Sequence, residues 1–167
     1  KAMATDLATG DGVILDHGSL PLAMRASMAV PGLFAPFEVG GRTLVDGGLV
    51  SNLPVQLARD MGADIIIAVN IGSDLERPED LASPAAVTQQ MTTILVGQNV
   101  RAQKALLRGQ DVLIEPQLSE LSFTDFAKGP QGVRQGERAA QGVEAKLATL
   151  SLSPHAYAAY RATHEPQ

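Results

Sequence analysis

The sequence predicts an α/β protein with a three-layer α/β/α fold and a mostly parallel central sheet. A run of apolar, largely β-branched residues at 65–69 lies between a predicted helix and a glycine. Such a run is typical of a strand that is buried on both faces. A predicted strand at 42–45 and a predicted helix at 55–61 precede it, and this strand–helix–strand order indicates a βαβ unit.

The start of the chain predicts a hairpin followed by a helix. Strand-like segments at residues 1–7 and 13–16 flank residues 10–12, Gly-Asp-Gly, which can supply the positive φ angles of a tight turn. Ser19 is a predicted N-cap for a helix that extends to about residue 29 and ends before Pro31.

A second hairpin and a short helix are predicted next. Residues 37–39 and 42–45 are expected to pair around Gly40-Gly41. Asn52 or Leu53 is expected to cap the helix at 55–61, with Pro54 in its first turn and Gly62 as its C-cap.

The second half of the chain predicts one long helix, one short buried strand and two further helices. Ser83 is the expected N-cap of the long helix. The expected ranges are 84–108 (helix), 111–116 (strand), 120–132 (loop), 133–150 (helix) and a last helix from Pro154. We expect residues 1–150 to form the C-terminal portion of a domain whose N-terminal portion lies upstream, and residues 151–167 to form a terminal helix or connector.

Composition argues against several classes of function. The formal net charge of −5, the 4% aromatic content and the lack of tryptophan all argue against a nucleic-acid-binding protein. The chain has no cysteine, so it has no disulfide, thiol nucleophile or zinc–thiolate site. The phosphate-binding, zinc-protease and nucleophile-elbow motifs are missing from the sequence, and the three histidines have no neighbouring ligand set.

Asp46 is the main candidate for a functional residue. It ends a predicted strand, and Gly47 and Gly48 follow it. In α/β sheets reactive groups gather beyond the carboxyl ends of strands, and two glycines leave room for another group to approach. A turn residue, a metal ligand and a catalytic base are all possible roles, and the local sequence by itself favours a plain Asp-Gly turn.

Several motifs in a fixed order surround Asp46. They are Ala4-Thr5-Asp6-Leu7, Arg25-Ala26-Ser27, the V-P-G-x-F-x-P segment at 30–36, Asp46-Gly47-Gly48, Asn52-Leu53-Pro54 and a helix–G-A-D–strand at 62–71. With these motifs, residues 2–72 resemble the second half of a patatin-like phospholipase domain. The remainder, residues 73–150, is compatible with the closing helices of that family.

The resemblance implies a lipid acyl hydrolase of the phospholipase A or lysophospholipase type that uses a Ser–Asp dyad. Asp46 would be the dyad acid, supported by Gly47 and Gly48, and no metal or organic cofactor is implied. The nucleophilic serine and the oxyanion loop would lie upstream of this chain. Ser27 and Ser51 are in no elbow motif, and neither is assigned as the nucleophile.

The resemblance also suggests partners and a location. The expected partners are a lipid or acyl-ester substrate, the upstream half of the same domain and a membrane surface. Met28, Leu33 and Phe34 are candidates for an acyl-chain pocket, with plain core packing as the alternative. The tail resembles the connector of secreted bacterial patatin-like proteins that continue into an outer-membrane barrel, which favours a bacterial secreted or cell-envelope location over the cytoplasm.

Two other functions stay open on the sequence. One is a catalytically silent patatin-like binding or scaffold module. The other is a metal-dependent hydrolase with Asp46 as a ligand, although no second carboxylate or histidine lies at ligand spacing.

Overall fold

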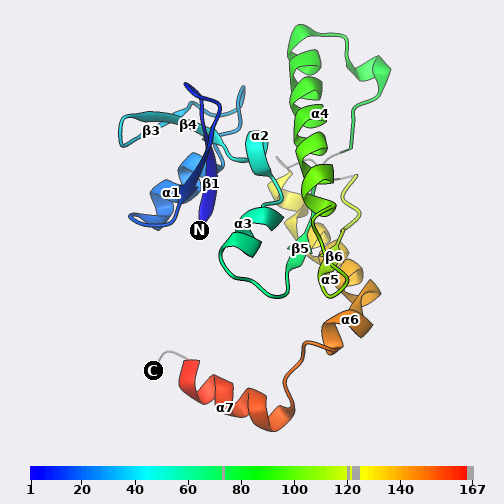
Figure 1. Cartoon of the computed structure of the whole chain (residues 1–167). Coiled ribbons are helices and arrows are strands. Elements are labelled where there is room, and N and C mark those ends of the chain that lie inside the picture. Colours follow the sequence, from blue (N-terminus) through cyan, green and yellow to red (C-terminus); the bar gives the residue numbers. More distant parts are fainter. Residues whose placement is uncertain (73, 120, 122–124, 165–167) are drawn as a thin grey trace.

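The computed structural model describes residues 1–72, 74–119, 121 and 125–164 of the chain (Figure 1). The N-terminal part is a four-stranded antiparallel sheet with the order β2-β1-β4-β3. Its strands are β1 (Ala2–Asp6), β2 (Gly12–Leu15), β3 (Phe37–Val39) and β4 (Arg42–Asp46). Both predicted hairpins are therefore confirmed. The second turns at Gly40 and Gly41, whose φ angles of 58° and 76° suit glycine and few other residues.

Helix α1 (Leu20–Ser27) covers one face of this sheet (Figure 1). Ala26 of the helix packs against Ala4 and Leu44, and all three are almost fully buried. The two alanines let the helix backbone come close to the strands. Ser19 precedes the helix as predicted, but its side chain makes no capping hydrogen bond.

The second part of the fold is built around a parallel strand pair. Strand β5 (Ile67–Val69) pairs with β6 (Val112–Ile114), and helices α3 (Val55–Asp60) and α4 (Pro84–Lys104) pack nearby. Its core consists of Leu53, Val55, Ile66, Ala68 and Val100. The short helix α2 (Gly48–Ser51) contacts both β1 and α4, so it links the two parts of the molecule (Figure 1).

The C-terminal region is helical. It contains α5 (Gly129–Gly142), α6 (Glu144–Ala148) and α7 (Pro154–His164), and two single 3-10 turns lie at Pro78–Asp80 and Phe126–Lys128. The predicted α7 is confirmed, and Figure 1 shows it set apart from the rest of the chain. None of the helices in the described ranges is long and apolar enough to cross a membrane.

Several predicted boundaries differ from the structure. The expected helix at 133–150 begins at Gly129 and is interrupted at Val143, directly after Gly142, whose missing side chain weakens a helix. The helix expected to reach residue 108 ends at Lys104, although its predicted N-cap is confirmed by a hydrogen bond from the Ala86 N–H to Ser83 Oγ (3.1 Å). Residues 120 and 122–124 of the expected loop lie outside the described residues.

The α/β class is confirmed, but the parallel part of the sheet is small. Only β5 and β6 pair in parallel in the described ranges, and β4 and β5 belong to different sheets. We expected the strand at 65–69 to be interior to a sheet. Instead β5 pairs along one edge only in this part of the chain, and Ile67 and Val69 are half-exposed.

Candidate active site

Asp46 is the last residue of β4, as the sequence predicts, and its backbone is held on both sides. Its N–H donates to the Ala29 carbonyl (3.0 Å), and its own carbonyl accepts from the Thr5 hydroxyl (2.9 Å). The strand end is thus tied both to the segment after α1 and to β1. These two hydrogen bonds fix the backbone of Asp46, from which its side chain extends.

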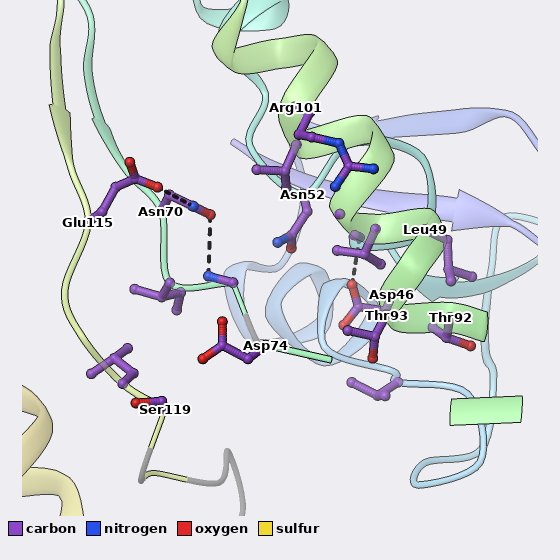
Figure 2. A pocket seen from close by; sticks show the side chains of 18 of the residues that line it. Asp46, Leu49, Asn52, Asn70, Asp74, Thr92, Thr93, Arg101, Glu115 and Ser119 are labelled. Carbon is purple, nitrogen blue, oxygen red and sulfur yellow. Dashed lines mark hydrogen bonds between the residues drawn. The ribbon is translucent and has the colours of Figure 1, made fainter. Parts of the chain in front are cut away.

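The Asp46 carboxylate is partly buried and has one fixed hydrogen bond. Oδ1 accepts from the Gly48 N–H at 2.6 Å (Figure 2). Burial raises the pKa of Asp46 above the ordinary aspartate value, and the Gly48 hydrogen bond opposes this by stabilising the charged form. The net effect is a raised pKa, which makes the carboxylate a better proton acceptor once it is ionised.

The two positions after Asp46 require glycine because a side chain there would clash with neighbouring atoms, not because of their backbone angles. Gly47 has φ −67° and ψ −19°, ordinary values for any residue. A Cβ at Gly47, however, would lie 2.5 Å from the carbonyl carbon of Met3, and one at Gly48 would lie 2.9 Å from Asp46 Oδ1 and 2.8 Å from Asn52 Oδ1. The D-G-G motif therefore lets the chain turn directly against β1 beside the carboxylate.

Asp46 faces a cleft of about 570 Å³. The cleft is bounded by α2, by one side of α4 and by the segments that follow β5 and β6 (Figure 2). Three polar residues at the carboxyl ends of three strands meet there, namely Asp46, Asn70 and Glu115. In α/β proteins ligands bind beyond the carboxyl ends of parallel strands, and Asn70 and Glu115 hold that position after β5 and β6.

A polar cluster lies across the cleft from Asp46 (Figure 2). Glu115 accepts hydrogen bonds from Lys104 Nζ (2.5 Å) and Asn70 Nδ2 (2.9 Å), and these, Lys104 first, lower the pKa of Glu115. We did not single out these residues from the sequence. Asn70 and Glu115 each follow directly after a strand, and that position is the signal that could have identified them.

The other candidate residues do not line the cleft. Met28, Leu33 and Phe34 are 50%, 47% and 40% exposed, and the cleft receives Val30 and Pro31 from their segment instead. Ser27 is the last residue of α1, and Ser51 is the last residue of α2. Neither serine is among the lining residues.

Among the residues that the structure describes, no histidine lines the cleft. In the described ranges, no group of three or more His, Asp or Glu side chains could hold a metal ion. His17 lies beside Asp16 with its side chain 93% exposed, and His155 and His164 belong to α7. The carboxylates that line the cleft are those of Asp46, Asp74 and Glu115.

The chain is similar in sequence to known proteins over part of its length. The chain is an α/β protein with a carboxylate at a strand end inside a cleft. Residues 4–59, which include the whole D-G-G motif, match the model of the patatin-like phospholipase family.

Three relatives illustrate the similarity. An uncharacterized NTE family protein of Mycobacterium tuberculosis is 39% identical over 94 residues, which cover 56% of this chain and 26% of the relative. A second uncharacterized NTE family protein of that species is 28% identical over 163 residues, covering 84% of this chain and 28% of the relative. Mouse patatin-like phospholipase domain-containing protein 7 is 39% identical over 74 residues, covering 43% of this chain and 6% of the relative. The chain spans about a quarter of the length of the mycobacterial relatives.

Proposed function

We propose that the protein is a lipid acyl hydrolase of the phospholipase A or lysophospholipase type. Asp46 is the acid of a Ser–Asp dyad, and the nucleophilic serine belongs to the upstream part of the same domain. Residues 1–150 complete that domain, and the substrate is a lipid or related acyl ester. The observation that carries the proposal is the Asp46 carboxylate, which is held by the Gly48 N–H and directed into the cleft, within the segment that matches the family.

In this mechanism the two carboxylate oxygens of Asp46 have different roles. Oδ1 is occupied by the Gly48 N–H, and within the described ranges no donor contacts Oδ2, which is free to accept the serine proton. The serine oxygen then attacks the ester carbonyl carbon, and the protonated Asp46 returns its proton to the leaving alcohol. Water, activated by the same carboxylate, hydrolyses the acyl-enzyme and releases the fatty acid.

The test is Asp46→Asn in the full-length protein with an ester substrate. The amide keeps the shape of the side chain but cannot accept the proton, so kcat should fall by at least about a hundredfold. KM should change much less. In the parent enzyme activity should decline as the pH falls through the raised pKa of Asp46, because the base must be ionised to act.

The control replaces His17, His155 and His164 together. A Ser–Asp dyad gives histidine no role, and these residues lie away from the cleft, so kcat should stay within a few-fold of the parent. Circular dichroism confirms the folding of each variant. A folded Asp46→Asn protein with parental turnover, or a triple-histidine variant without turnover, would contradict the dyad. A folded parent that hydrolyses no ester would instead favour a catalytically silent module.

A further inference from the structure

Asn99 on α4 is bound to the segment that carries the D-G-G motif. Its Nδ2 donates to the Gly48 carbonyl at 2.8 Å and to the Leu49 carbonyl at 3.3 Å, while its Oδ1 accepts from the Asn52 N–H at 3.2 Å. Both ends of one amide side chain are therefore used to hold α2. The side chain is partly buried between the two helices, where water competes less for these bonds.

Gly48 is the residue on which these contacts converge. Its N–H donates to Asp46 Oδ1, and its C=O accepts from Asn99 Nδ2. Glycine has the greatest backbone freedom of any residue, so fixing both of its polar groups restricts it strongly. Helix α2 has only four residues, too few to be stable alone, and it depends on such outside partners.

We propose that Asn99 is a positioning residue for Asp46: it holds Gly48 so that the Gly48 N–H stays on the carboxylate. This inference rests on the proposed function, because Asp46 must be the base for its orientation to affect turnover. Asn99 does not line the cleft and would act only through Gly48.

Gln103, one turn further along α4, is a matched comparison. Its Oε1 accepts from the Gln56 N–H at 2.9 Å, so it ties α3 to the same helix with the same amide chemistry. No contact joins Gln103 to Asp46, Gly47 or Gly48 in the described part of the chain. Loss of either amide removes a link between helices, but only loss of Asn99 frees Gly48.

The charged groups around Asp46 do not account for the shift of its pKa, so they do not affect the comparison of the Asn99 and Gln103 variants. Those on the cleft wall and on the neighbouring β1 and α1 are Asp6, Arg25, Asp74, Arg101, Lys104 and Glu115. The pKa of Asp46 has two causes, burial that raises it and the Gly48 N–H that lowers it, and none of these side chains contributes. Loosening the Gly48 N–H should therefore raise the pKa of Asp46 further.

The experiment compares Asn99→Leu with Gln103→Leu in the full-length enzyme. Asn99→Leu should lower kcat by about ten- to a hundredfold, because small displacements of a catalytic group are costly, and KM should stay within about threefold. Its acid-side loss of activity should move to higher pH. Gln103→Leu should keep kcat within about threefold and leave the pH profile unchanged, even where both variants lower Tm.

A double-mutant cycle completes the test. If Asn99 acts through Asp46, then Asn99→Leu should cause little further loss of kcat in an Asp46→Asn background. If Asn99→Leu does not fold, Asn99→Ser takes its place in the same comparison. Equal kcat values and pH profiles for the Asn99 and Gln103 variants, or fully additive losses in the cycle, would overturn the inference. Parental turnover in Asp46→Asn would instead overturn the proposed function, so the two failures are distinguishable.

Discussion

At the scale of single residues, the site depends on two glycines, Gly47 and Gly48, that have no side chain. Gly47 lies against the Met3 carbonyl, and Gly48 lies between the Asp46 carboxylate and the Asn52 amide. Any side chain at either position would force the strand end away from β1 or push the carboxylate aside. Close packing around Asp46 therefore explains why two glycines follow it. The backbone angles of Gly47 are ordinary and do not by themselves require a glycine there.

Gly47→Ala should accordingly lower both the stability of the fold and the turnover of the enzyme. The added methyl group meets the backbone of Met3, which cannot move aside as a flexible side chain could. We expect unfolding to be easier by about 1–3 kcal/mol, the usual cost of overpacking, and kcat to fall at least about tenfold as Asp46 is displaced. Denaturant unfolding and turnover measure the two effects.

Gly136→Ala is the control for this substitution. Gly136 lies inside α5, where an added Cβ meets no atom within 4 Å, so alanine should be neutral or stabilising by up to about 1 kcal/mol. A Gly47→Ala protein that matched the parent in both stability and kcat would mean that the contact with Met3 does not constrain the site.

At the scale of elements, an ion pair between the partly buried Arg59 and the buried Asp111 joins α3 to the residue before β6. The Asp111 carboxylate accepts from Arg59 Nη2 (2.6 Å) and from the backbone N–H groups of Arg108 (2.6 Å) and Ile66 (2.8 Å). Arg59 also donates to the carbonyls of Ala63 and Asp64, beyond the end of α3. These bonds hold the parallel pair in the register that brings Asn70 and Glu115 to the cleft.

Removal of this carboxylate should destabilise the fold. Asp111→Ala leaves Arg59 without its partner, and we expect a loss of about 3–5 kcal/mol in the free energy of unfolding. The exposed pair between Arg77 and Glu79 (3.6 Å) offers a control, since Glu79→Ala should cost less than about 1 kcal/mol. Similar losses for the two variants would contradict the structural role of Asp111.

The same group predicts a pH dependence of stability. The Arg108 N–H, followed by the Ile66 N–H and Arg59, lowers the pKa of Asp111 below its ordinary value. A carboxylate with a lowered pKa in the folded state stabilises the fold above its unfolded pKa, and this contribution is lost as the pH falls through the folded value. The free energy of unfolding should therefore decrease in acid, and by less in Asp111→Ala.

At the scale of the whole molecule, the described part of the chain leaves an apolar strand unpaired along one edge. β5 has a single partner, β6, and Ile67, Val69 and Ile71 are between 50% and 66% exposed. An apolar strand with an open edge readily pairs with other chains. The upstream half of the domain, under the proposed function, is the natural cover for this surface.

The isolated 167-residue chain should therefore aggregate or form oligomers. Sedimentation velocity measures this directly. Ile67→Lys with Val69→Lys places charges on the open strand and should reduce self-association, as should addition of the upstream half as a separate polypeptide. A compact, soluble monomer of the unmodified chain would contradict the prediction.

Elements whose position depends on residues close together in the sequence were predicted correctly from that sequence. Turn glycines located both hairpins, Ser83 located the start of α4, and Pro154 located α7. Asp46 was placed at a strand end for the same reason, because the strand-like run before it and the two glycines after it can be read locally. The order of motifs predicted the resemblance to the patatin-like phospholipase family, whose model matches residues 4–59.

Features that depend on distant partners were not predicted. Helix α2 is four residues long and is held by Asn99, which lies 51 positions after Gly48, so no local pattern indicates it. The polar cluster of Asn70, Lys104 and Glu115 unites three separate elements. Met28, Leu33 and Phe34 looked like pocket residues from their chemistry, but the path of the loop after α1 directs Val30 and Pro31 to the cleft instead.

The residues alone were sufficient to predict the α/β class, the resemblance to the patatin-like family and the position of Asp46 at a strand end. Composition, turn chemistry and motif order are properties of neighbours in the chain, so they can be read without the fold. Tertiary structure decided which side chains share the cleft with Asp46, why Gly47 and Gly48 must lack a Cβ, and how Gly48 is fixed by a helix far along the sequence. Those features arise from close packing and hydrogen bonds between segments whose approach depends on the whole fold.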